Sequence, residues 1–265
     1  TSIKGRNLYE NDNIFYTGLI NGKLTEWKII PILDNTVNKS KKKVIKCNYN
    51  FEIKEKKHLY AHKSSISIIE IYQKQNLIIT SGEDKYIYIR KIFDFELLTA
   101  INLNYSYGND IVSQNINVFP IMLKVSEINL LFVLVYDYDK QKSFVRGYNL
   151  NGLFFAQTDQ IFFKDNKEFL EINNFSFTKY SNLVVGFYNS NKIFVLNAGM
   201  LSPIWMKELE EKEEGKKDKK EKVQEKGNKN VEFNSNNGEF YVLKEHEIIF
   251  TSINDKSKLK EFDSF

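Results

Sequence analysis

The chain contains three histidines, His58, His62 and His246, and any Ser-His-Asp triad or histidine-ligated metal site must draw on them. Ser81 and Asp84 follow His62 in a repeated unit described below, so these three side chains have the residue types of a triad. We instead expect a buried hydrogen-bond network, because buried polar groups require partners far more often than they perform chemistry. The other two histidines lie in a lysine-rich segment and a predicted turn. No catalytic residue is expected, and the chain is predicted not to be an enzyme.

Cofactor and metal chemistry lacks its usual sequence signatures. The single cysteine, Cys47, cannot form an internal disulfide, which favours a reducing compartment. Cys47 has no histidine nearby in sequence, so we expect a packed or edge thiol rather than a reactive one. The sequence contains no glycine-rich phosphate loop and no CxxC pair. Asp137–Asp139 is too short to supply the roughly six to eight oxygens that calcium requires, and we interpret it as a hairpin turn. We therefore expect no cofactor and no metal.

Basic residues raise the question of an anionic partner. The chain carries 38 basic and 34 acidic residues, a net charge of +4, which does not by itself indicate nucleic acid. Lys41, Lys42 and Lys43 form a cluster without acidic neighbours, and with Lys39 and Lys46 it approaches the roughly four to eight lysines of anionic-lipid sites. Two interpretations stay open for this cluster: a solvated loop and a contact with an anionic surface.

A second basic candidate is Arg146, in Phe144–Gly147. A phosphoinositide-binding propeller loop has two adjacent arginines, and one guanidinium cannot form the paired clamp. This segment is also predicted to be a strand ending at Tyr148. We do not expect a headgroup site here.

Short runs of β-branched and aromatic residues dominate the chain and predict strands. Several of these runs are continuous rather than alternating, which is typical of strands buried on both faces. Hydrophobic residues are 42% of the chain, aromatic residues 14% and charged residues 27%, as in a globular protein. The predicted strands include Ile14–Leu19, Ser67–Tyr72, Leu77–Thr80, Tyr86–Arg90, Leu131–Tyr136, Phe144–Asn149, Leu183–Tyr188, Lys192–Asn197, Phe240–Leu243 and Ile248–Ile253.

One unit recurs along the chain: a strand, a tight polar turn, and a strand ending in a bulky residue. It occupies Phe15–Trp27 and Ile78–Arg90, with looser copies at Phe132–Tyr148 and Val184–Leu196. Their terminal residues are 63, 58 and 48 residues apart. A four-stranded propeller blade takes about 40–45 residues, and loop insertions lengthen it. The repeats predict an all-β propeller with four-stranded blades, about five in this chain.

Three insertions account for the excess length: Asp34–Lys57, Asn102–Asn117 and Lys207–Asn230. The last is a run of Lys and Glu with almost no apolar residues, so we predict a disordered or fraying-helix insertion between blades. Its lysines are matched by glutamates, and nucleic-acid binding is not expected there. Residues 1–265 form one predicted propeller domain. The opening at Thr1, inside a predicted blade, favours an excerpt of a longer polypeptide. Two alternatives stay open: five blades that close alone, and a larger propeller with further blades outside this chain.

The second copy of the repeat, Ile78–Arg90 with the residues before it, resembles a WD repeat. The WD-repeat pattern is Gly-His, a strand, Ser-Gly-x-x-Asp, and a strand ending Trp-Asp. Here the unit has Ala61-His62, Ser81-Gly82-Glu83-Asp84 and a strand ending in Arg90-Lys91; in the first unit Trp27 takes the tryptophan position. The resemblance implies that His62, Ser81 and Asp84 satisfy one another and that tryptophan covers the set. Loss of one buried partner costs about 1–3 kcal/mol.

The amino-acid sequence resembles the C-terminal WD-repeat region of protist BEACH-domain proteins in three segments: Asp84–Leu103, Ser143–Thr158 and Asn173–Tyr188. The resemblance extends over most of residues 14–206, and the BEACH domain itself lies outside the chain. It implies a non-enzymatic protein–protein interaction platform of a membrane-trafficking scaffold, cytoplasmic and peripheral on endomembranes through the parent protein.

Two other functions remain as alternatives: a WD-repeat structural subunit of a ciliary, cytoskeletal or ribonucleoprotein assembly, and a propeller hydrolase that uses the central channel. The expected partners are proteins rather than nucleic acid. The sequence shows no apolar run of the roughly 20 residues that a transmembrane helix needs.

Overall fold

A computed structural model describes residues 2–6, 13–33, 49–104, 117–158, 172–178, 182–187, 192–208, 230–234, 239–244 and 247–252. Contacts within this part of the chain divide it into two compact units, Thr1–Asn102 and Leu103–Phe265. Each unit is described on its own below.

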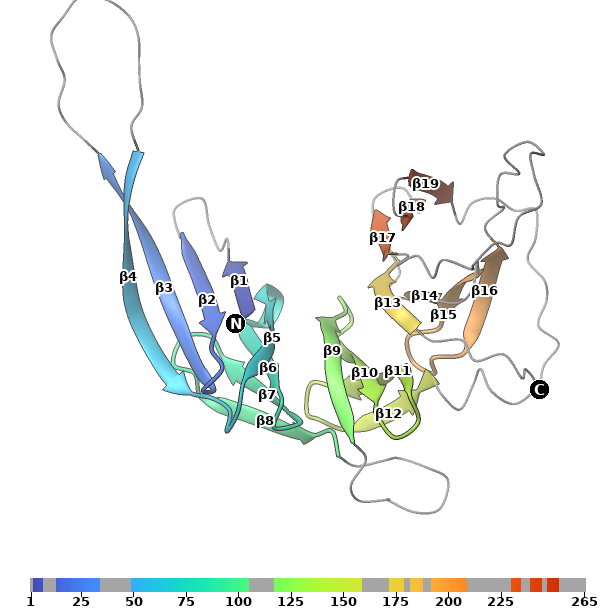
Figure 1. Cartoon of the computed structure of the whole chain (residues 1–265), viewed down its shortest axis with the longest axis horizontal. Coiled ribbons are helices and arrows are strands. Elements are labelled where there is room, and N and C mark those ends of the chain that lie inside the picture. Colours follow the sequence, from blue (N-terminus) through green and yellow to red (C-terminus); the bar gives the residue numbers. More distant parts are fainter. Residues whose placement is uncertain are drawn as a thin grey trace, which may run out of the picture. The chain divides into compact units, whose positions relative to one another are not determined.

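The described residues form five antiparallel sheets, and in each sheet the strands follow one another in chain order (Figure 1). Four of the sheets have four strands and the fifth has three described strands. The all-β prediction is therefore confirmed, and so are four strands in four of the five described sheets. The first unit holds β1 (Ser2–Arg6), β2 (Ile14–Gly18), β3 (Lys23–Leu33) and β4 (Tyr49–Tyr60), then β5 (Ile66–Tyr72), β6 (Leu77–Gly82), β7 (Tyr86–Lys91) and β8 (Leu97–Asn102), with a 3₁₀ turn η1 (Gln73–Gln75) before β6.

The second unit holds the other three sheets. Their strands are β9 (Val118–Val125), β10 (Leu130–Asp137), β11 (Lys142–Asn149) and β12 (Phe154–Gln157); β13 (Ile172–Phe177), β14 (Leu183–Phe187), β15 (Lys192–Leu196) and β16 (Pro203–Glu208); and β17 (Asn230–Asn234), β18 (Glu239–Lys244) and β19 (Glu247–Ser252).

The strand predictions agree with these boundaries to within about two residues. One difference concerns the first insertion, because residues 49–57 belong to the long strand β4 rather than to a loop. The charged insertion predicted at Lys207–Asn230 borders on strands: Lys207 and Glu208 end β16, Asn230 begins β17, and residues 209–229 lie outside the described residues.

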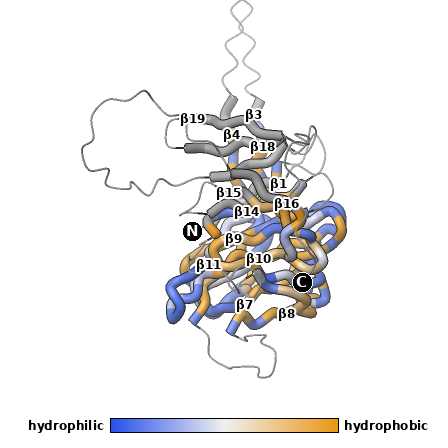
Figure 2. Tube along the Cα trace, turned by 90° about the vertical axis from the view of Figure 1, so that its right-hand side faces the viewer, coloured by the Kyte–Doolittle hydropathy of each residue, from blue (hydrophilic) through white to orange (hydrophobic). Residues whose placement is uncertain are grey.

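Continuous apolar strands are buried on both faces, as their sequence pattern predicted. In β10 the five residues from Leu131 to Val135 are each 0% exposed. Figure 2 shows hydrophobic residues along such strands. Each side chain of this kind contributes about 1.5–3 kcal/mol on burial. The core of the second unit includes Phe132, Val145, Phe175, Leu183 and Leu196, and that of the first includes Tyr16, Leu24, Ile66, Ile78 and Phe95.

Turns of the second unit repeat in detail. Ser126 and Thr178 begin equivalent turns, and each side-chain oxygen accepts the backbone N–H four residues later, at Leu130 and Asn182 (both 3.1 Å). In each case the backbone N–H of the first residue also donates to the carbonyl of the fourth following residue. These short hydroxyl side chains replace a backbone partner at the point where the ladder ends. The repeat is thus a repeat of turn chemistry as well as of strands.

Candidate functional site

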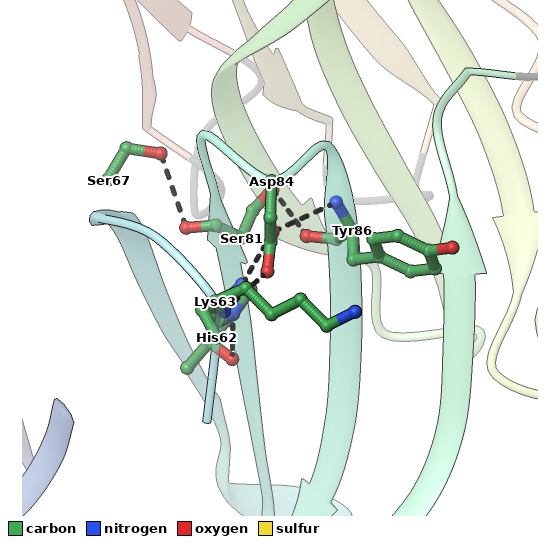
Figure 3. A network of polar contacts seen from close by, with 7 residues as sticks. His62, Lys63, Ser67, Ser81, Asp84 and Tyr86 are labelled. Atoms are coloured by element: carbon green, nitrogen blue, oxygen red, sulfur yellow. Dashed lines mark hydrogen bonds and ion pairs between the residues drawn. The ribbon is translucent and has the colours of Figure 1, made fainter. Parts of the chain in front are cut away.

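The polar network of the second sheet centres on His62, between β4 and β5 (Figure 3). Its Nδ1 lies 2.9 Å from Asp84 Oδ1, and its Nε2 lies 2.9 Å from Thr80 Oγ1. A carboxylate can only accept, so Nδ1 donates to Asp84, and in the neutral ring Nε2 accepts from the Thr80 hydroxyl. The His62 side chain is 0% exposed and that of Asp84 is 8% exposed.

Asp84 also holds the backbone of two elements. Its Oδ2 accepts the N–H of Lys63 at 3.0 Å, and its Oδ1 accepts the N–H of Tyr86 at 3.2 Å. Burial raises the pKa of this carboxyl, but the hydrogen bond and charge of His62, together with the two backbone donors, outweigh burial and hold the pKa below its ordinary value. The aspartate therefore joins the turn after β6 to the segment before β5.

Ser81 lies beside this network but has different partners. Its hydroxyl donates to the Tyr86 carbonyl at 3.3 Å, while the carbonyl of Ser81 accepts from the Ser67 hydroxyl at 3.2 Å. Thr80, one residue earlier on β6, takes the histidine contact that the WD-repeat resemblance implied for Ser81. Neighbouring residues on a strand point to opposite faces, so only one of the two can meet the His62 ring.

Trp27 lies in the first sheet, away from the residues just described. Its indole N–H donates to the Thr17 hydroxyl at 2.8 Å, and its ring stacks on Phe15 with 6.2 Å between centroids. In the second sheet Tyr88 packs edge-on against His62 at 4.7 Å, and Arg90 donates to the Phe95 carbonyl at 3.2 Å. The structure thus brings together His62 and Asp84 with Thr80, places Ser81 next to them, and places Trp27 in a separate pair.

Chemically, an Asp–His–Thr chain has the order of a catalytic triad. Thr80 is 0% exposed, however, and its hydroxyl is bonded to His62, so a substrate has no access to the oxygen. Among the described residues, no group of three or more His, Cys, Asp or Glu side chains is placed to hold a metal ion. The arrangement is that of a structural network.

A second polar cluster, in the first unit, was missed by the sequence analysis. Glu26 on β3 is 3% exposed, accepts from the Tyr16 hydroxyl at 3.1 Å, and pairs with Lys56 at 3.0 Å and Lys57 at 3.2 Å. Burial raises the pKa of Glu26, but the two lysines outweigh burial and hold the pKa below its ordinary value. Lys57 also donates to the Ile92 carbonyl at 2.6 Å, so this cluster joins the first sheet to the second.

Glycine explains the close approach of these two sheets. Gly22, in the turn before β3, has φ of +78°, and its carbonyl accepts the N–H of Ala61 at 2.9 Å. A Cβ at this position would lie 2.0 Å from the His62 carbonyl oxygen. Both the dihedral angle and the contact require a residue without a side chain.

The remaining residues that the sequence analysis considered for a binding or catalytic role lie apart from the His62 network. Arg146 is 0% exposed within β11, and its Nη1 donates to the Leu103 carbonyl at 2.8 Å, so it is no surface anion site. His58 lies on β4, exposed and in contact with Glu55. Asp137 and Asp139 border the β10–β11 hairpin turn as predicted, and Asp137 Oδ1 accepts the N–H of Asp139 at 3.0 Å. Outside the described residues lie Cys47, His246 and the cluster Lys41, Lys42 and Lys43.

Comparison with known proteins gives a likeness of fold. No family model matches the chain, and no curated protein matches it either. The crystal structure of Raptor from Chaetomium thermophilum is similar, with a TM-score of 0.55 at 12% identity over 91% of this chain and 18% of that chain. The β-propeller domain of Cps50 (Swd1) from Myceliophteria thermophila has a TM-score of 0.49 at 12% identity, over 89% of this chain and 65% of that chain.

The chain thus spans less than a fifth of the Raptor chain that it matches. At this identity the likeness concerns the fold and carries no activity with it. Four-stranded antiparallel sheets in chain order, a His–Asp network in the second sheet and this structural likeness agree with the propeller prediction. The fold of this chain is a WD-repeat-like β-propeller.

Proposed function

We propose that this chain is a non-enzymatic platform that binds other proteins. The observation that carries the proposal is how its chemically capable side chains are used: His62 bonds to both Thr80 and Asp84, His62 and Thr80 are buried, and the Asp84 side chain is only 8% exposed. Large apolar side chains, by contrast, stand at the surface. Ile20 in the β2–β3 turn is 79% exposed and Phe93 in the β7–β8 turn is 70% exposed. Exposed apolar side chains in turns are suited to partner contacts.

The finer proposal is a role in a BEACH-type membrane-trafficking scaffold, in the cytoplasm and peripheral on endomembranes through the parent protein. Its support is the sequence resemblance over most of residues 14–206. In the described part of the chain we find no helix with the length and hydropathy needed to cross a bilayer.

Proximity labelling of the full-length parent protein in its own cell tests both levels of the proposal. We expect labelled proteins of vesicles and endosomes, against a control in which the labelling enzyme is expressed alone. Labelling of ciliary, cytoskeletal or ribonucleoprotein subunits would instead identify the alternative assembly. Sequencing of the transcript upstream of Thr1 separates these outcomes independently, because the trafficking proposal requires a BEACH domain there.

The hydrolase alternative has its own test. A reactive serine or threonine hydrolase is modified by a fluorophosphonate probe, because the nucleophile attacks phosphorus and expels fluoride. We expect the 265-residue chain to remain unmodified. Stoichiometric modification that is lost in the Thr80→Val variant would contradict the structural role given to this network.

A further inference from the structure

The largest fully buried side chain among the described residues is that of Arg146, which is 0% exposed. It lies on β11, the third strand of its sheet, and Gln157 of the outer strand β12 lies directly opposite. An arginine does not release its proton inside a protein, so the guanidinium keeps its positive charge. A buried charge is costly unless a charge of opposite sign accompanies it. The surroundings of Arg146 therefore need an explanation.

Two contacts satisfy part of the guanidinium. Its Nη1 donates to the Leu103 carbonyl at 2.8 Å, and its Cζ lies 5.3 Å from the centroid of the Phe144 ring. The carbonyl accepts one N–H group and the ring face attracts the cation, but neither contact supplies a full negative charge. Among the described residues, no aspartate or glutamate forms an ion pair with Arg146.

The other two nitrogens of the guanidinium, Nε and Nη2, are buried and have no hydrogen-bond partner. They share one edge of the planar group, because Nη1 is the nitrogen on the side of Cδ. The N–H bonds along this edge are parallel, and it is an edge with which arginine holds an anion by two bonds at once. An acceptor is needed to satisfy these donors, and an anion is needed to compensate the charge.

A second buried arginine shows which part of this arrangement is unusual. Arg90 on β7 has its Cζ 5.3 Å from the centroid of the Tyr88 ring, two residues earlier on the strand, and its Nη1 donates to the Phe95 carbonyl at 3.2 Å. Arg90 is 9% exposed, and Nε alone is buried without a partner. The aromatic contact and the carbonyl acceptor are thus common to both arginines. Among the described residues, only Arg146 has a whole edge of its guanidinium enclosed and unused.

We propose that the Nε–Nη2 edge of Arg146 binds a small inorganic anion of the chloride type inside the second unit. One such ion accepts both parallel N–H bonds and compensates the buried charge. A carboxylate of a partner protein would bring its main chain with it, and a side chain that is 0% exposed leaves no path for one. A water molecule would accept hydrogen bonds but leave the charge uncompensated. This site does not depend on the protein-binding role proposed above.

The ladder beside Arg146 is irregular, which supports entry of an ion. Between β11 and β12, Gly147 pairs with Ala156, and the register then shifts so that Tyr148 pairs with Phe154. The strand β12 has four residues and is the outer strand of its sheet. A short outer strand with a bulge opens locally at less cost than a central strand. We therefore expect the ion to exchange through local opening of β12, without global unfolding.

Thermal unfolding of the purified 265-residue chain tests the proposal. At constant ionic strength, replacing sodium gluconate by sodium chloride should raise the melting temperature along a saturation curve, because only the folded chain binds the ion. At a chloride concentration of about a hundred times Kd, the unfolding equilibrium constant should be about a hundredfold smaller. Gluconate is too bulky for an enclosed site and serves as the reference. Equal melting temperatures in the two salts would assign the edge to water and overturn the proposal.

Paired variants locate the ion. Arg146→Met removes the charge, so the chloride dependence should disappear, and in gluconate the melting temperature should equal or exceed that of the unaltered chain. The matched control is Arg90→Met, which should keep the chloride dependence of the unaltered chain. Arg146→Lys keeps the charge but lacks the two parallel N–H bonds, so its Kd for chloride should rise by about tenfold or more. Chloride dependence that persists in Arg146→Met, or that both methionine variants lose equally, would overturn the assignment.

Bromide keeps the test valid if these substitutions impair folding, because it requires only the unaltered chain. Crystals grown in sodium bromide should give an anomalous peak within hydrogen-bond distance of both Nε and Nη2 of Arg146. Peaks beside surface residues alone would identify an adventitious ion only and would overturn the proposal. Loss of the peak when bromide is replaced by gluconate would confirm that the scatterer is the anion.

Discussion

His62 Nδ1 donates a hydrogen bond of 2.9 Å to Asp84 Oδ1. His62 lies in the segment between β4 and β5, and Asp84 lies in the tight turn between β6 and β7. The two residues are 22 positions apart in sequence, and Asp84 also accepts the backbone N–H of Lys63 beside the histidine. This pair therefore fixes the chain segment that enters the second sheet against a turn within that sheet. The pair thus holds the β4–β5 connection in place.

Replacement of Asp84 by alanine should lower the free energy of unfolding by about 1–3 kcal/mol, because His62 and two backbone N–H groups lose a buried acceptor. Urea denaturation followed by circular dichroism measures the loss. Asp94→Ala serves as the control: Asp94 is exposed and accepts one local backbone N–H in the β7–β8 turn, so its effect should be much smaller. Equal losses would contradict the central place of Asp84.

The same aspartate predicts a dependence of stability on pH. Its pKa is lower in the folded chain than in the unfolded chain, so the stabilisation is present above the unfolded pKa of about 4 and disappears as pH falls through the folded value. Denaturant midpoints measured from pH 6 downward through the unfolded pKa should fall less steeply for Asp84→Asn than for the unaltered chain. Parallel profiles for the two proteins would show that another carboxyl dominates.

Glu26 offers a comparison between a buried and an exposed ion pair. Glu26→Gln should cost about 1–3 kcal/mol, because Lys56 and Lys57 lose a charged acceptor that is itself buried. Glu52→Gln removes the charged partner of Lys54. The Glu52 side chain is 47% exposed and that of Lys54 is 56% exposed, so the substitution should cost less than about 0.5 kcal/mol. Thermal unfolding of the two variants side by side measures the difference.

Gly22→Ala should be among the most destabilising single-methyl changes in the first unit. The new Cβ would meet the His62 carbonyl at 2.0 Å, and alanine disfavours φ of +78° by about 1–2 kcal/mol before any clash. Gly199→Ala is the control, because its Cβ would meet one side-chain oxygen at an ordinary 3.4 Å. Similar melting temperatures for the two variants would mean that the β4–β5 connection can move away from the turn.

Residues 209–229 are predicted to be dispensable for folding. Ordering a segment costs about 1–2 kcal/mol of backbone entropy per residue, and this stretch has almost no apolar side chains to bury in return. A short Gly-Ser bridge from Glu208 to Asn230 should therefore leave the melting temperature within a few degrees. A bridge that also removes β16 (Pro203–Glu208) should cause a large loss, because that strand pairs with β15.

Strands and their order were predictable because they depend on local composition, whereas side-chain partners depend on neighbours from other strands. The runs around Leu131–Tyr136 and Tyr86–Arg90 are rich in β-branched and aromatic residues, and their limits followed directly. His62 contacts Thr80 rather than Ser81 because of the face of β6 that each residue occupies. A shift of one residue in strand register exchanges the two faces, and sequence spacing alone does not fix the register to one residue.

Two features escaped the sequence analysis for the same physical reason. Glu26 reads as a solvated charge on β3, and its burial follows from two lysines on β4 whose alignment is set by the bulge between Glu26 and Trp27. Residues 49–57 of β4 read as part of a loop because five of the nine are lysine or glutamate, which are poor strand formers. Its pairing with the apolar part of β3 overrides that preference.

The order of the strands has a consequence for how the chain is made. Every described ladder joins strands that are consecutive in sequence, so, apart from β3 and β4 with residues 34–48 between them, each hairpin closes over a short stretch of chain. Such local contacts reduce the loop-closure entropy that slows most all-β proteins, and a hairpin forms in about 1–10 μs. A ribosome adds only about 5–20 residues per second, so each sheet can complete its pairing before the next one has been synthesised. We therefore expect the nascent chain to acquire protease resistance in steps, one sheet at a time, rather than in a single event after release.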